Sequence, residues 1–192
     1  MRLRAAVIVG LALIAGCRTQ STVSPYQVPS EADRATSVAE KLNREAADLI
    51  DSNPAKAESL LRDALTKDLF FGPAHNNLGV VFLHQQKLYE AAHEFEWARK
   101  LLPGNPDPRV NLALTLERAG RLDEAFKTYE TALEVAPEGL AAIEGLASLA
   151  LRTQREDVRL AAWIERIALE AQDESWRRWA LAQHPGRGAA VR

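Results

Sequence analysis

A pattern of small and apolar residues recurs every 34 positions in this 192-residue chain and constrains its fold more than any other feature. Seven positions of one copy match seven positions of the next at this single spacing. The matched sets are Leu78, Gly79, Phe82, Ala91, Phe95, Ala98 and Pro103, and Leu112, Ala113, Leu116, Ala125, Tyr129, Ala132 and Pro137. A fixed period of this length indicates a stack of similar helical hairpins, in which small residues let neighbouring backbones approach closely.

Composition agrees with a helical chain. Hydrophobic residues make up 47% of the sequence but aromatic residues only 6%, so most of the apolar content is alanine and leucine, which favour helices. The formal net charge is -2, and the charges of both signs are mixed along the chain. Nucleic-acid binding is not expected, because its affinity depends on many basic contacts to phosphates.

The repeated residues resemble the tetratricopeptide repeat, whose pattern of Leu-Gly, aromatic, Ala, aromatic, Ala and Pro they follow. This resemblance implies an all-α fold, a right-handed solenoid of antiparallel helix hairpins with three to four repeats and a C-terminal capping helix. The expected domain covers residues 31–183. Its repeats are expected at about 31–71, 72–105, 106–139 and 140–172, with the capping helix at 173–183 and a disordered tail at 184–192.

Local signals predict where several of these helices begin and end. Asn53 is expected to cap a helix that starts at Pro54, and Asp107 is expected to open the first helix of repeat 106–139. Gly120 is expected to end that helix in a left-handed conformation, and Asp123 to cap the helix that follows.

The outer repeats depart from the period. In repeat 31–71, Arg44 and Glu45 take the place of the Leu-Gly pair, which predicts a connecting loop one residue shorter than in the other repeats. The apolar stripe expected on its first helix comprises Ala35, Val38, Leu42, Ala46 and Leu49. In repeat 140–172 a longer loop is expected over residues 153–157, and Trp176 and Trp179 are expected to pack as part of the terminal cap.

The amino-terminal residues indicate export. Arg2 and Arg4 precede an apolar stretch over residues 5–16, which is too short for a permanent membrane helix and suits a signal peptide. Residues 13–17 resemble a bacterial lipobox, which implies cleavage after Gly16 and attachment of a diacylglyceryl group to Cys17, with further acylation such as palmitate. Residues 17–30 then form the lipidated cysteine and a flexible tether. The alternative is a plain secretory leader with a cysteine near its cleavage site.

The resemblance to lipoproteins also bears on localisation. Arg18 follows the cysteine, whereas retention in the inner membrane is usually signalled by aspartate at that position. The expected location is therefore the bacterial cell envelope, with the protein lipid-anchored in the outer membrane and facing the periplasm.

No pattern of residues points to catalysis. The sequence lacks a nucleophile triad, a phosphate-binding glycine loop and a dinucleotide fingerprint. His75 and His84 are nine residues apart, on opposite faces of one helix, and no cysteine completes a metal set. Glu94 and Glu96 are interpreted as ordinary solvated helix surface. The expectation is a protein that is not an enzyme and needs no cofactor or metal.

Binding is the expected activity, because first helices line the concave surface in the tetratricopeptide family. The predicted peptide-binding groove consists of Asn76, Asn77, Val80, His84, Asn111, Leu114, Arg118, Ser148 and Arg152. Its amides can donate to and accept from a peptide backbone, and its basic column can attract an acidic segment. Two alternatives remain: these residues are common structural choices in the family, or the partner binds the convex face around Trp97.

The leading functional hypothesis is a membrane-anchored, non-catalytic scaffold or adaptor that binds a protein or peptide partner in the cell envelope. One alternative is an accessory lipoprotein for assembly of a pilus or secretion system. Another is an adaptor that regulates a cell-wall enzyme. Self-association is also open, because an uncovered end of a repeat stack can pair with a second copy.

Overall fold

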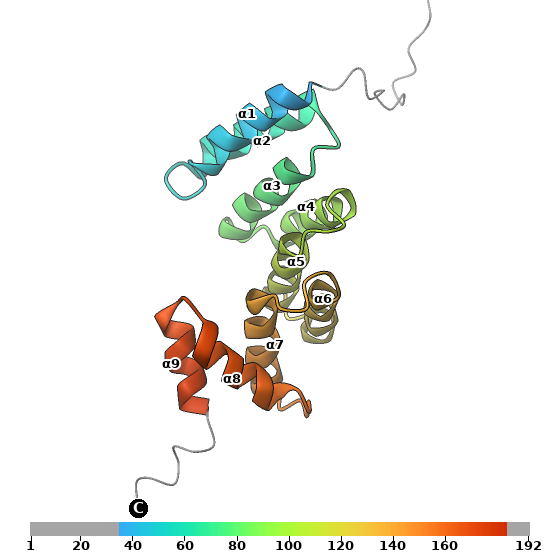
Figure 1. The fold of residues 1–192 in the computed structure, drawn as a ribbon. Helices are drawn as coiled ribbons and strands as arrows, with labels where there is room; N and C mark the ends of the chain where they lie inside the picture. Colours follow the sequence, from blue (N-terminus) through green and yellow to red (C-terminus); the bar gives the residue numbers. More distant parts are fainter. Residues whose placement is uncertain (1–34, 184–192) are drawn as a thin grey trace, which may run out of the picture. The chain divides into compact units, whose positions relative to one another are not determined.

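The computed structural model describes residues 35–183, and in this part of the chain nine α-helices form without a strand (Figure 1). The helices are α1 (Thr36–Ala47), α2 (Pro54–Lys67), α3 (Gly72–His84), α4 (Leu88–Leu101), α5 (Asp107–Arg118), α6 (Leu122–Val135), α7 (Leu140–Arg152), α8 (Leu160–Glu170) and α9 (Glu174–Gln183). The all-α class that the 34-residue period predicts is confirmed. The leader, Cys17, the tether and the C-terminal tail lie outside the described residues.

Consecutive helices pair as hairpins, α1 with α2, α3 with α4, α5 with α6 and α7 with α8, and α9 follows on α8 (Figure 1). Each first helix of a hairpin also contacts the first helix of the next, and each of α2, α4 and α6 packs against the helix that follows it. This is the connectivity of a helical-repeat solenoid, in which every repeat buries its apolar face against its neighbours.

Small residues at the 34-residue spacing lie where the helices approach most closely. Ala57, Ala91 and Ala125 have no exposed surface. Phe95 is fully buried against Gly79, and a β-carbon built on Gly79 would lie only 2.6 Å from the ring. The repeated small residues therefore make room for the repeated rings, which explains why both recur together.

Three turns share a left-handed residue at the same spacing. Gly120 has φ of 76°, as expected from the sequence, and Gln86 and Gln154 have φ of 60° and 53°. Each follows the last turn of a first helix, at the position where a left-handed residue ends helices. The sequence identifies only the glycine, because glutamine carries no such signal.

The first hairpin differs from its expected register. Six residues separate α1 from α2, whereas three separate α3 from α4, so the loop is longer and the prediction of a shorter loop is wrong. On α1, Ala39 and Ala46 of the chain's first hairpin are buried, whereas Val38, which the sequence placed in the apolar stripe, is 43% exposed. Asn53 caps α2 as predicted, since its side chain accepts a hydrogen bond from the backbone N–H of Lys56.

The cap predicted for α6 is also wrong. The helix begins at Leu122 and the capping position is Arg121, which makes no side-chain capping bond. Asp123 therefore lies within the first turn, and its carboxylate forms an ion pair with Arg155. A carboxylate in the first turn is still favoured by the helix dipole.

The fourth hairpin has the longer loop that its sequence predicts. Residues 153–159 connect α7 to α8, and two arginines of this loop fasten it to α6. The Arg155 guanidinium lies 4.4 Å from the centre of the Phe126 ring, and Arg159 pairs with Glu130 at 2.7 Å.

The C-terminal helix covers the end of the stack. Trp176 and Trp179 of α9 are half-buried, pack against the core cluster and meet edge to face with ring centres 5.2 Å apart. This supports the interpretation of the tryptophans as packing in the cap. Of the helices in residues 35–183, none has the length and apolar character needed to cross a bilayer.

Candidate peptide-binding surface

The predicted groove residues lie on α3, α5 and α7, which follow one another as neighbouring first helices. We call the surface formed by the nine predicted groove residues the first-helix face. Its basic residues, His84, Arg118 and Arg152, are exposed, and its other members are half-buried. The face therefore combines accessible basic side chains at its edge with partly accessible amide and aliphatic groups at its centre.

Amides link successive repeats across this face. Asn77 donates a hydrogen bond from Nδ2 to Oδ1 of Asn43 at 2.9 Å, and Asn111 donates in the same way to Asn76 at 3.1 Å. Asn43 lies outside the predicted groove, although it precedes Asn77 by the 34 residues of the repeat, a signal that could have identified it. Each amide in a pair uses only part of its hydrogen-bonding capacity, so donors and acceptors remain for a ligand.

Two of the three basic residues on the first-helix face already lie beside a carboxylate of the protein. Arg152 forms an ion pair with Glu117 at 2.8 Å, and His84 Nδ1 lies 3.7 Å from a carboxylate oxygen of Asp51. Arg118 is exposed and forms no ion pair with the described residues. Of the three side chains predicted to attract an acidic segment, Arg118 is therefore the one whose charge is not already matched.

Glu117 organises this edge of the face. Besides Arg152, it accepts a hydrogen bond of 3.4 Å from the hydroxyl of Tyr129, a residue that is almost fully buried. Burial raises the pKa of the Tyr129 hydroxyl, and the nearby Glu117 carboxylate raises it further, so Tyr129 stays neutral and donates the bond.

The C-terminal end of the first-helix face has a different electrostatic character. Glu144 on α7 is half-buried, and this burial, together with the nearby carboxylate of Asp173, raises the pKa of Glu144 above its usual value.

His75 does not belong to the first-helix face. His75 is buried, with Nδ1 2.6 Å from Glu94 and Nε2 2.9 Å from the carbonyl oxygen of Leu69, and its ring stacks on Trp97. The interpretation of Glu94 as solvated surface is wrong, because the carboxylate meets this buried histidine. Among residues 35–183 there is no group of three or more histidine, cysteine, aspartate or glutamate residues that could hold a metal ion.

Comparison with models of known families identifies the family of this chain. A family model described as tetratricopeptide repeat matches residues 51–107, 86–133 and 110–175, which together exceed half of the sequence. The chain belongs to the tetratricopeptide repeat family. A comparison with curated proteins finds no match.

Solved structures agree with the fold. The first repeat domain of Spaghetti (RPAP3), bound to the HSP90 peptide SRMEEVD, is 16% identical with a TM-score of 0.60, over 64% of this chain and 98% of that one. MamA is 19% identical with a TM-score of 0.60, over 67% and 75%. The Sgt2 repeat domain from Aspergillus fumigatus is 19% identical with a TM-score of 0.60, over 66% and 85%. These structural similarities establish the solenoid fold. Because the sequence identities are low, the ligand of this chain has to be inferred from its own residues.

Proposed function

We propose that this protein is a lipid-anchored interaction scaffold of a bacterial cell envelope, which binds an extended segment of a partner protein on its first-helix face. Repeat domains of this family bind protein or peptide partners, as in the complex of the Spaghetti domain with an HSP90 peptide. Binding of this kind needs no chemistry from the scaffold, which acts as an adaptor. The lipobox-like residues 13–17 support the anchor.

The observation that carries the binding proposal is the row of half-satisfied amides beside an unmatched cation. Asn76, Asn77 and Asn111 are held in place by bonds between repeats, so they offer their remaining donors and acceptors in a fixed geometry. Preorganised groups lose little entropy when a ligand binds. Arg118 then supplies the one charge with which a carboxylate of the partner can pair.

The binding test combines Asn111→Ala with Arg118→Glu. Crosslinking in intact cells, followed by purification of the protein, should recover a specific adduct from the wild type and much less from the double variant. Thermal stability should change by no more than about 0.5 kcal/mol, as is usual for surface substitutions. Equal recovery from both proteins would contradict binding on the first-helix face.

The anchor is tested separately. Cys17→Ser should release the protein from the membrane fraction and abolish incorporation of labelled palmitate, since several acyl chains are needed for lasting attachment. Arg18→Lys, which keeps both the cysteine and the charge, should leave both properties intact. A Cys17→Ser protein that stays with the membranes would exclude a lipid anchor at this residue.

A further inference from the structure

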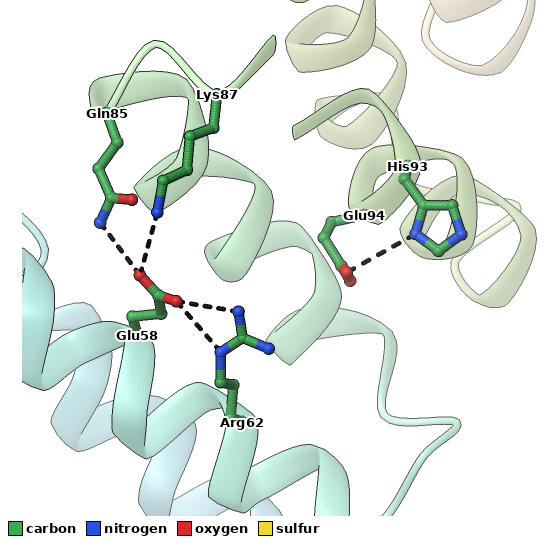
Figure 2. Close-up of polar contacts among 6 residues, drawn as sticks. All are labelled: Glu58, Arg62, Gln85, Lys87, His93 and Glu94. Atoms are coloured by element: carbon green, nitrogen blue, oxygen red, sulfur yellow. Dashed lines mark hydrogen bonds and ion pairs between the residues drawn. The ribbon is translucent and has the colours of Figure 1, made fainter. Parts of the chain in front are cut away.

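The grooves between successive second helices differ in how they are closed. Between α2 and α4, Glu58 accepts hydrogen bonds from Arg62 at 2.9 Å and from Gln85 at 3.2 Å, and pairs with Lys87 at 4.0 Å (Figure 2). Partial burial opposes the charge of Glu58, but these partners still hold its pKa below the usual value. The cluster ties α2 to the turn that precedes α4, so this end of the groove is occupied by the protein's own side chains.

Ion pairs also cross the groove between α6 and α8. Arg159 at the start of α8 pairs with Glu130 of α6, and Arg166 of α8 reaches the turn after α6, where it pairs with Glu138 and donates a hydrogen bond to its carbonyl oxygen at 3.0 Å. This groove is therefore bridged near both ends.

The groove between α4 and α6 has no such polar bridge among the described residues. Its ion pairs stay within single helices or their caps, Arg99 with Glu96 at 2.7 Å and Arg121 with Glu124 at 2.7 Å, and none of the hydrogen bonds or ion pairs among the described residues joins α4 to α6. A cavity of about 360 Å³ lies between the two helices. It is lined by Tyr89, Ala92, His93, Glu96, Arg99, Leu112, Leu116, Arg121, Glu124, Lys127, Thr128 and Thr131.

The floor and rim of this cavity suit a different ligand chemistry from the first-helix face. Leu112 and Leu116 of α5 provide an apolar floor, and the Tyr89 ring at one end is 82% exposed. Each rim carboxylate already pairs with an arginine, so Lys127 is the permanent cation left over, with His93 close by. The groove therefore has a local excess of positive charge in a chain whose formal net charge is -2.

The length of the groove indicates the shape of its occupant. The lining on α4 runs from Tyr89 to Arg99, which corresponds to about 15 Å along a helix, or roughly three turns. An amphipathic helix placed in a groove between two helices buries one apolar stripe and leaves its flanks at the rim. We propose that the groove between α4 and α6 is a second docking surface, which binds a short amphipathic helix of a partner protein through an apolar side chain above Leu116 and an acidic side chain beside Lys127.

This surface is separate from the first-helix face, so it adds to the proposed function and does not depend on it. The two surfaces share α5 but no residue, since the predicted peptide-binding residues belong to α3, α5 and α7, whereas the groove has its walls on α4 and α6 and its floor at Leu112 and Leu116. A scaffold with both surfaces can hold two segments at once, which increases avidity when they belong to one partner.

The test uses a displayed library of amphipathic helices of about 16 residues, with acidic or basic flanks beside one apolar stripe. The full chain is the target, and an unrelated helical-repeat protein removes non-specific binders. Helices with acidic flanks should be enriched. Thr128→Trp places a large side chain in the groove, so it should raise the Kd of the enriched helices about tenfold, as expected when a central contact is lost. Glu134→Trp, a similar change on an exposed part of α6 outside the groove, should leave the Kd unchanged.

A reversal of charge provides the second arm. Lys127→Glu should shift the enriched helices from acidic to basic flanks, while Lys56→Glu on α2 should not. If Thr128→Trp lowers the melting temperature, this arm decides the outcome, because Lys127 is exposed and away from the core. Absence of enrichment, or preference for basic flanks by the wild type, would overturn the docking surface. Loss of binding in Asn111→Ala with Arg118→Glu would also overturn it and assign the peptides to the first-helix face.

Discussion

Gln86 and Gln154 occupy a backbone conformation in which a side chain is crowded by its own carbonyl group, with φ of 60° and 53°. For an L-residue this conformation costs about 1–2 kcal/mol. Glycine avoids that cost but loses about 0.5–1 kcal/mol through its greater freedom in the unfolded chain. The equivalent turn with Gly120 shows that the fold accepts glycine at this position.

We therefore expect Gln86→Gly to raise the free energy of unfolding by about 0.5–1 kcal/mol, measured by urea denaturation. Ala119→Gly is the matched control, because Ala119 is an exposed residue of the same turn one repeat later with an ordinary φ of -78°. The control should destabilise the protein by a similar amount. Equal destabilisation by both variants would show that the left-handed conformation carries no net strain.

Glu144 gives a dependence of stability on pH. Burial and the neighbouring Asp173 raise its pKa in the folded state, so the folded protein binds the proton more tightly than the unfolded chain does. The favourable contribution is present below the usual pKa of glutamate and is lost as the pH rises through the raised value. Glu144→Gln should therefore raise the melting temperature at pH 7 and have little effect in acid below the usual pKa. An equal shift at both pH values would exclude titration of Glu144 as the cause.

Within the α3–α4 hairpin, one contact sets how closely the two helices approach. The Phe95 ring fills the space beside Gly79 completely, with three ring atoms within 2.9 Å of where a β-carbon would stand. The ring is fully buried and cannot move without disturbing the seam to the next repeat. The hairpin thus depends on a pair of residues, and neither explains the packing alone.

Gly79→Ala should destabilise the protein by about 1–3 kcal/mol through overpacking. Combining it with Phe95→Leu should recover part of the loss, because the smaller side chain leaves room for the methyl group, and a double-mutant cycle measures this coupling. Gly104→Ala is the control, since no atom lies within 4 Å of its β-carbon position. Strict additivity of the two hairpin variants would contradict direct packing between residues 79 and 95.

In residues 35–183, the sequence predicts the packing that follows from the 34-residue period, and it misses the polar contacts between side chains of different helices. The burial of Ala91, Phe95 and Ala125 follows from the 34-residue spacing, because equivalent positions meet equivalent neighbours. The bond between Asn43 and Asn77 also joins residues 34 apart, so the period could have revealed it, but the predicted groove did not include Asn43. The 34-residue period also does not show which grooves are bridged by ion pairs. The carboxylate that an arginine such as Arg159 contacts depends on how the helices pack.

A chain of repeats distributes its stability unevenly, and the C-terminal hairpin is the place to test this. Each repeat contacts only its neighbours, so a lost contact should loosen the nearest helices first. Trp179→Ala removes half of the edge-to-face pair that covers α8, and hydrogen exchange followed by mass spectrometry should show faster exchange in α7, α8 and α9 while α3 and α4 keep their protection. Arg178→Ala, an exposed change on the same helix, should leave all of these rates unaltered. Uniformly faster exchange after Trp179→Ala would mean that residues 35–183 unfold as one cooperative unit, and the cap would then stabilise the whole stack and not only its end.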